Sequence, residues 1–461
     1  MGIADHGPSE SAGPKRQLSL FDSTSIIVGI IIGAGVYQIA PDVARGVFCP
    51  AEGAAGEFYS SLAVLLIWLI GGLLSLCGAI TYAELATAYP QEGGDYVYLT
   101  RAFGRWAGFL FGWIQLVVVR PGDIALMALA FATYASQLYD PLSGQASDIT
   151  AGVYSVAAVM ILTAINVLGV REGKWVQNLL TSVKVLGLAA IIIVAVIGPG
   201  VPREPTAFEP MGIRLALIFV LFAFGGWNEM AYVAAEVRNP DRNILRALVV
   251  GTATVTVLYV LLNGAFLYSL GYYGLANSKA VAADAIATVF PDIGSRLISA
   301  LICISALGAV NGLIFTGARI SYALGADHHV FNFFSKWDPR TGTPLRALVV
   351  QGGIACTLLA ALGNFIDVIL YTAAAVYAFY FATSMALLVL RVREPHVRRP
   401  YRATGYPFTT LIFAIVCLLL IHAGVTYRPI HSAVAAGLIL LGLPIFWLTR
   451  HIRPESRTAT Q

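Results

Sequence analysis

Twelve apolar runs, each near or above the roughly 20 residues that cross a bilayer as a helix, constrain this chain more than any other feature. Hydrophobic residues make up 58% of its 461 residues and charged residues only 12%, whereas a soluble domain carries about 25% charged residues. A helix satisfies its own backbone hydrogen bonds in lipid. We therefore predict an all-α polytopic membrane protein, with spans at roughly 20–45, 58–88, 104–138, 150–169, 173–198, 211–237, 244–271, 293–325, 345–362, 364–391, 405–426 and 430–449.

The stretches between these runs are too short to fold as separate units. We expect one membrane domain at 20–450, flanked by tails at 1–19 and 451–461. Positive charge predicts its orientation, since lysine and arginine collect on the cytoplasmic side. Of the 29 such residues, 21 fall in or beside the tails and even-numbered loops, 6 on the other side and 2, Arg120 and Lys184, deep within the membrane. Both termini are predicted to be cytoplasmic, and the net charge gives no reason to expect nucleic acid as a partner.

Two glycine clusters interrupt apolar runs at mid-depth. Gly33-Ala34-Gly35 lies within 26–40, and Gly225-Gly226 lies within 215–235. A break inside a membrane helix persists where it lines a protein cavity. Glycine is also a common packing residue in membrane helices, as the spacing of Gly29 and Gly33 illustrates. The pairing of the breaks favours a solute site.

The breaks fall in spans 1 and 6, which run in opposite directions because they are five spans apart. This predicts an inverted five-plus-five repeat, with broken helices 1 and 6. The first repeat covers about 20–198 and the second about 211–391, and the last two helices lie at about 405–449.

The backbone chemistry of such breaks is specific. The half-helix that begins after Gly35 offers unpaired N–H groups, which suit a carboxylate. The half-helices that end near Ile31 and Phe224 offer carbonyl oxygens, which suit an ammonium group. A ligand that carries both groups is an amino acid.

Several motifs, in order along residues 20–450, resemble the L-type amino acid transporters. These are the light subunits of heteromeric transporters, in the amino acid–polyamine–organocation superfamily, and they have a LeuT-like fold. The matching motifs are Gly29-Ile30-Ile31-Ile32-Gly33-Ala34-Gly35, Glu92-Gly93-Gly94-Asp95-Tyr96, Arg120-Pro121, Phe222-Ala223-Phe224-Gly225-Gly226-Trp227-Asn228 with Glu236 and Asn239-Pro240-Asp241-Arg242-Asn243, and Gly308-Ala309-Val310-Asn311-Gly312 with Phe315-Thr316 and Arg319.

The resemblance implies alternating access and a substrate site shared by spans 1 and 6. The span-1 glycine motif would bind the substrate carboxylate, and neighbouring carbonyls would take the amino group. An aromatic residue of span 6, here Phe222, would be a gate. The implied substrate-binding residues are Ile30, Ile31, Gly33, Ala34, Gly35, Phe222, Ala223, Phe224 and Gly225.

Lys184 lies inside the apolar stretch 179–196, where a charge is costly and rarely accidental. One interpretation is that it extends to the cytoplasmic surface from two turns inside span 5. The resemblance favours another, because sodium-independent family members carry a lysine here. Its ammonium would replace a sodium ion and connect spans 1 and 8, which makes sodium coupling unexpected.

Four other charged residues inside spans need an interpretation. Arg120 and Asp123 are three residues apart and can pair across one helical turn, so we interpret them as a structural ion pair. Glu229 follows Asn228, the position where related antiporters carry a proton-sensing glutamate. Three interpretations of Glu229 stay open: its side chain faces the site, it titrates during transport, or it pairs with another residue of the bundle. Glu84, near the end of span 2, is interpreted as interfacial.

Other classes of site have little support. The five cysteines show neither disulfide nor zinc spacing, and Asp327-His328-His329 reads as a solvated loop. Protease, hydrolase and nucleotide-binding motifs are missing. We expect no enzyme activity, metal or cofactor.

The loop 138–149 has no cysteine to bond a heavy subunit, so we expect a stand-alone protein of a bacterial inner membrane. The resulting hypothesis is a sodium-independent antiporter of neutral L-amino acids. The alternatives are a proton-coupled symporter, an amino acid sensor that does not transport and, remotely, an intramembrane enzyme.

Overall fold

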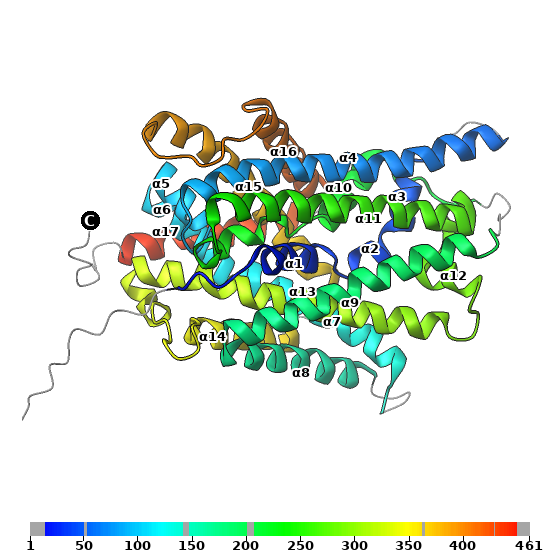
Figure 1. The fold of residues 1–461 in the computed structure, drawn as a ribbon, viewed down its shortest axis with the longest axis horizontal. Helices are drawn as coiled ribbons and strands as arrows, with labels where there is room; N and C mark the ends of the chain where they lie inside the picture. The colour runs from blue at the N-terminus through cyan, green and yellow to red at the C-terminus, as the bar shows by residue number, and fades with distance from the viewer. Residues whose placement is uncertain are drawn as a thin grey trace, which may run out of the picture.

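The computed structural model describes residues 14–49, 53–141, 147–200, 207–361, 365–427 and 429–449. Within these ranges, eleven helical segments are long and apolar enough to cross a membrane. A further apolar helix, α14 (Leu345–Ala361), is shorter and lies where span 9 was predicted. The long helices run roughly parallel to one another (Figure 1). The protein is an all-α polytopic membrane protein, as the apolar runs predicted.

Two predicted spans are broken where the glycine clusters lie. In span 1, α1 (Leu20–Ile31) ends before the glycines, and α2 (Gly35–Gln38) and α3 (Ala40–Gly46) follow them. In span 6, α10 (Ile213–Ala223) gives way to η2 (Trp227–Glu236), which is a 3₁₀ helix and not the expected α-helix. Span 3 contains an unpredicted five-residue π-helix, η1 (Gln115–Val119), between α6 (Arg105–Ile114) and α7 (Arg120–Leu138).

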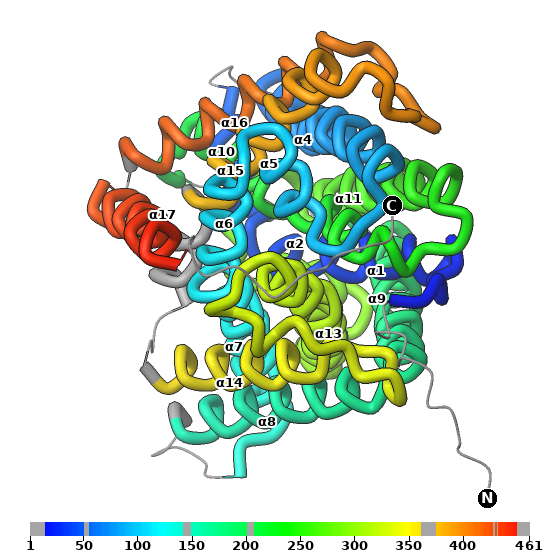
Figure 2. The backbone as a smooth tube through the Cα atoms, turned by 90° about the vertical axis from the view of Figure 1, so that its left-hand side faces the viewer, coloured from blue at the N-terminus to red at the C-terminus, as the bar shows by residue number. Residues whose placement is uncertain are grey.

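The remaining helices complete the bundle and its loops. They are α4 (Gly53–Ala88), α5 (Asp95–Phe103), α8 (Ser147–Leu168), α9 (Val170–Ile197), α11 (Pro240–Asn277), α12 (Val281–Ala287), α13 (Gly294–Asp327), η3 (His329–Phe334), α15 (Phe365–Arg393), α16 (Phe408–Tyr427) and α17 (Pro429–Thr449). Figure 2 looks along the bundle and places α8, α14, α16 and α17 at its periphery, while α1, α2 and α13 lie further in. Burial agrees, because most of α13 is buried and little of α17 is.

The start of α1 is fixed by local and distant contacts. Ser19 and Asp22 form a capping box, in which each side chain accepts a hydrogen bond from the other's backbone N–H. Asp22 also pairs with Lys174 of α9, whose Nζ lies 3.0 Å from its carboxylate. Just before the helix, Leu18 pairs with Val237, directly after η2. The start of the first broken span and the end of the second are therefore joined to each other.

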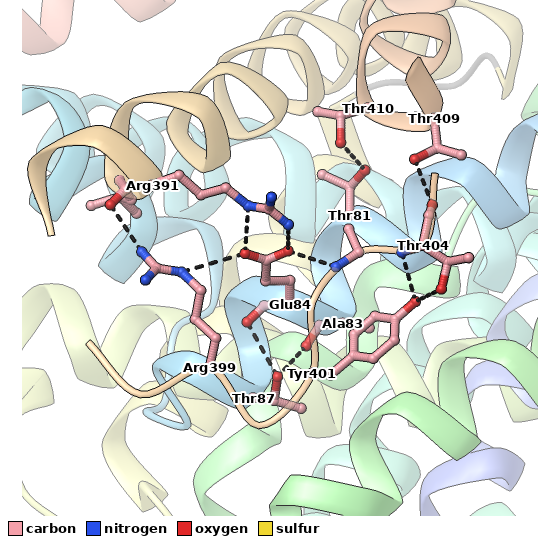
Figure 3. Close-up of polar contacts among 12 residues, drawn as sticks. Thr81, Ala83, Glu84, Thr87, Arg391, Arg399, Tyr401, Thr404, Thr409 and Thr410 are labelled. Carbon is pink, nitrogen blue, oxygen red and sulfur yellow. Dashed lines mark hydrogen bonds and ion pairs between the residues drawn. The ribbon is translucent and has the colours of Figure 1, made fainter. Parts of the chain in front are cut away.

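Glu84 of α4 is fully buried, so its interpretation as an interfacial residue is wrong. Its carboxylate accepts hydrogen bonds from both sides of the Arg391 guanidinium and from the Ala403 amide, 2.6 Å away. The Nε atom of Arg399 lies 3.4 Å from the same carboxylate (Figure 3). Two guanidinium groups compensate the buried charge. Glu84 therefore connects α4 to α15 and to the segment that leads into α16.

We expect Glu84→Gln to lower the free energy of unfolding by about 2 kcal/mol. The amide keeps one acceptor but leaves two guanidinium groups without a counter-charge, at a cost reduced by the partial exposure of Arg391. Denaturation of the purified protein in detergent measures the effect. Glu209→Gln, at an exposed position, is the matched control and should leave stability unchanged. Equal stability of the two variants would contradict a structural role for Glu84.

Candidate functional site

A cavity of about 160 Å³ lies between the two broken spans. A single water molecule needs roughly 10–15 Å³ of such space, so the cavity has room for a small solute. Its wall includes most of the predicted site and two predicted coupling residues, namely Ile30, Ile31, Gly33, Gly35, Phe222, Ala223, Gly225, Asn228 and Glu229. The structure thus brings residues of spans 1 and 6 to one cavity, although they lie about 190 positions apart in the sequence.

Three predicted residues do not line the cavity. Ala34 is buried within the first break, although its backbone belongs to that break. Phe224 is buried against Trp68 and Tyr259, with ring centroids 6.2 and 5.2 Å away. Lys184 is also fully buried and lies behind α1. These three positions can act on a solute only through the backbone or through neighbouring helices.

The first break leaves backbone groups without helical partners. In the described part of the chain, the amides of Ala34 and Gly35 donate to no backbone carbonyl. A Cβ added at Gly35 would meet no atom within 4 Å, because the cavity lies beside it. At Gly33 an added Cβ would lie 3.3 Å from the sulfur of Met127. The break therefore leaves two N–H groups without backbone partners, and that of Gly35 lies beside open space.

The second break needs glycine for a steric reason. Gly226 has a φ of 107°, and an added Cβ would lie 2.6 Å from Cγ2 of Ile30. The amide of Gly225 turns back to the carbonyl of Phe222, 2.9 Å away. Gly226 therefore allows the broken part of span 6 to pack directly against the broken part of span 1. Phe222 is half-buried and forms part of the cavity wall.

Tyr259 of α11 connects the two breaks, a role that the sequence analysis missed. Its hydroxyl lies 3.0 Å from the carbonyl oxygen of Ile31 and 3.3 Å from that of Ala223. The Ile31 oxygen also accepts from the Gly33 amide at 2.8 Å. Two acceptors predicted for a substrate amino group are therefore already in use. The signal in the sequence was a hydroxyl within an apolar run, which by itself does not identify a partner.

Arg120 pairs with Glu229, and the predicted Arg120–Asp123 pair is wrong. Both terminal nitrogens of Arg120 lie 2.8 Å from carboxylate oxygens of Glu229, and both side chains are about 95% buried. Thr316 of α13 donates to the same carboxylate at 2.6 Å. Of the three interpretations of Glu229, the pair within the bundle describes these contacts, and Glu229 also lines the cavity. The pair joins α7 to η2 across the site.

Asn228 and Lys184 have well-defined partners. Asn228 donates to the hydroxyl of Tyr232 and accepts from that of Tyr380, each at 2.7 Å, which connects η2 to α15. The ammonium of Lys184 donates to the carbonyls of Gly29, Ile32 and Ser305 at 2.7, 2.9 and 2.9 Å. The alternative in which Lys184 extends to the membrane surface is wrong, because the side chain is fully buried.

Two further motif residues make buried contacts near the same end of the bundle. Arg319 of α13 pairs with Glu236, the last residue of η2, at 2.7 Å, and both side chains are fully buried. Asp95 at the start of α5 accepts hydrogen bonds from Tyr82 and Thr383. Burial raises the pKa of Asp95 to about 6, and these hydrogen bonds limit the rise. Both motifs connect helices around the site and do not line its cavity.

The whole chain is similar in sequence to known amino acid transporters. The profile of the family described as "Amino acid permease" matches residues 18–448. The chain is 31% identical over 443 residues to b(0,+)-type amino acid transporter 1 of Mus musculus, covering 94% of this chain and 87% of that protein. It is 32% identical to Asc-type amino acid transporter 1 of Mus musculus, with 95% and 82% covered. It is 30% identical to large neutral amino acids transporter small subunit 2 of Homo sapiens, with 97% and 84% covered.

Proposed function

The chain belongs to the amino acid permease family, and from this premise we propose that it is a sodium-independent exchanger of neutral L-amino acids. It is an amino acid transporter and not an enzyme, in keeping with its relatives, whose names describe amino acid transporters. The observation that carries the proposal is the cavity between two broken spans, with the unpaired backbone amide of Gly35 on its wall. Alternating access to this cavity would move the substrate.

The substrate's α-groups are proposed to bind the backbone at the breaks. The amides of Ala34 and Gly35 would donate to the carboxylate, since in the described chain they donate to no other backbone group. The carbonyls of Ile30 and Phe224 would accept from the ammonium. The carbonyls of Ile31 and Ala223 contribute less, because Tyr259 already donates to both.

Sodium independence is proposed from the contacts of Lys184. A sodium ion is held by oxygen atoms, and the three carbonyls around this ammonium form such a set. An ammonium group in their midst supplies a positive charge from within the protein. It also links α1, which carries the first break, to α13. The coupling of these helices then needs no ion from solution.

The proposed setting is a bacterial inner membrane, with both termini in the cytoplasm. The distribution of lysine and arginine supports this orientation. One similar protein is named a small subunit, and the name implies that a second subunit accompanies that protein. We propose that no disulfide links it to such a partner, because the loop 138–149 contains no cysteine.

Exchange in proteoliposomes tests the function. Uptake of labelled alanine, serine and leucine is measured in sodium-free buffer, into vesicles that are either empty or loaded with unlabelled amino acid. We expect uptake only into loaded vesicles. Uptake into empty vesicles that follows an inward proton gradient would show symport and contradict exchange. Binding without flux in either case would indicate a sensor.

Phe222→Ala should lower this exchange by at least about tenfold, because Phe222 forms part of the cavity wall and its ring would no longer close over the substrate. Phe219→Ala is the matched control. Phe219 lies on the same helix, packs against the core and does not line the cavity. Equal exchange rates for the two variants would show that Phe222 is not the gate.

A further inference from the structure

One charged side chain on the cavity wall has no partner. Asp123 of α7 lines the cavity and is half-buried. In the described part of the chain, its carboxylate makes no hydrogen bond and lies within 4 Å of no basic group. Other acidic residues near the breaks differ, since Glu229 has an arginine and a hydroxyl. A hydrogen bond or ion pair within the described chain therefore does not explain why a carboxylate lies at this position.

Arg120, one helical turn away, does not serve as that partner. Its two terminal nitrogens are bonded to the two oxygens of Glu229. Its Nε donates to the side-chain oxygen of Gln115 at 3.1 Å. Its guanidinium carbon lies 4.9 Å from the ring centroid of Tyr232. Three N–H groups of Arg120 thus donate to Glu229 and Gln115, and none of its described hydrogen bonds goes to Asp123.

When Asp123 is ionised, the wall of the cavity carries one excess negative charge. Among its described lining residues, the side chains charged in water are those of Arg120, Glu229 and Asp123. The first two neutralise each other, and Lys184 lies outside the wall with its ammonium bonded to carbonyls. An ionised carboxylate without a partner inside a membrane protein is costly. A cation in the cavity would offset that cost.

The location of Asp123 suits the end of a substrate side chain. Met127, on the same helix, lies against Gly33 at the first break, where the substrate carboxylate is proposed to bind. Asp123 comes four residues before Met127 in α7, so the two residues are about 6 Å apart along the helix axis. A lysine side chain, with a stem of about four carbons, spans that distance. The α-groups and the charged end of one substrate can therefore reach both places.

We propose that Asp123 forms a second subsite, which binds the positively charged group on the side chain of a basic amino acid. The proposal rests on the proposed amino acid exchange and widens its substrate class from neutral to basic amino acids. Charge-assisted hydrogen bonds in a low-dielectric cavity provide the selectivity. Neutral amino acids bind the same breaks but leave the Asp123 carboxylate without a partner.

Competition by matched ligands tests the proposal in the unaltered protein. Exchange of labelled leucine in loaded proteoliposomes is inhibited with lysine, ornithine or norleucine at pH 7. Norleucine has the lysine stem without the ammonium. We expect lysine to inhibit at a concentration at least about tenfold lower than norleucine, since a hydrogen bond to a charged group is worth that factor or more. If leucine is exchanged but lysine inhibits that exchange more weakly than norleucine does, the subsite is overturned and the proposed function stands.

Variants then assign the preference to Asp123. The ratio of the norleucine to the lysine inhibition constant should fall to about one in Asp123→Asn. Asp42→Asn is the control, because Asp42 pairs with Arg45 away from the cavity, and its ratio should equal that of the unaltered protein. Should Asp123→Asn not exchange leucine, binding of lysine and norleucine to the detergent-purified variant gives the same ratio. A lysine preference that survives in Asp123→Asn would overturn the proposal, whereas failure of the unaltered protein to exchange any amino acid would overturn the proposed function itself.

Discussion

Lys184→Met is expected to reduce amino acid exchange by roughly a hundredfold. Methionine has a similar length but no donor, so the carbonyls of Gly29, Ile32 and Ser305 lose a charged partner inside the protein. Hydrogen bonds to charged groups contribute about 1.5–3 kcal/mol each, and about 1.4 kcal/mol corresponds to a tenfold effect. A hundredfold reduction corresponds to about 2.8 kcal/mol, which two of these three bonds supply at about 1.5 kcal/mol each. The first break would also lose its connection to α13.

Initial rates of exchange and thermal midpoints in detergent measure the two consequences together. Lys279→Met is the matched control, because Lys279 is exposed in the connection between α11 and α12. This control should retain both the rate and the midpoint of the unaltered protein. If Lys184→Met kept more than half of the exchange rate, the ammonium would not be needed to hold α1 against α13.

The two breaks were predictable from sequence because their cause is local. A helix in lipid cannot leave its backbone groups unpaired, so small residues within an apolar run are informative. Gly226 shows why the residue type matters, since any side chain there would collide with Ile30. Periodicity and composition did not distinguish helix types. The 3₁₀ form of η2 and the π-helix η1 both occur in stretches for which the sequence predicted only a membrane-spanning helix.

Partners across the bundle were beyond the reach of local spacing. Arg120 lies three residues from Asp123, which favoured a pair along one helix, yet it binds a carboxylate 109 residues away. Glu84 lies near the end of an apolar run, which suggested the membrane interface. It is buried by a polar segment that contributes Arg399 and the Ala403 amide. In both cases the deciding contact depends on how helices pack, and charge type alone does not specify it.

Glu229→Ala is expected to lower the free energy of unfolding by about 3–5 kcal/mol. The substitution leaves the guanidinium of Arg120 buried without its counter-charge, and removal of one partner of a buried pair typically costs this much. The double variant Arg120→Leu with Glu229→Leu should be more stable than Arg120→Leu alone or Glu229→Leu alone, because it leaves no unpaired charge. Denaturant unfolding of the four proteins forms a double-mutant cycle and gives the coupling energy.

An exposed ion pair provides the control cycle. Arg398 and Asp241 are 3.1 Å apart with mostly accessible side chains, and their coupling should stay below about 1 kcal/mol. Equal coupling energies in the two cycles would contradict the role of burial at Arg120 and Glu229.

The same pair controls the charge of the cavity, which links stability to specificity. While Glu229 holds both terminal nitrogens of Arg120, Asp123 stays available to a basic substrate. In Glu229→Gln, the guanidinium loses its counter-charge one helical turn from Asp123 and is free to pair with it. We therefore expect Glu229→Gln to lose the lysine preference although Asp123 is intact. A preference that persists in this variant would show that Arg120 is held away from Asp123 by Gln115 and Tyr232 alone.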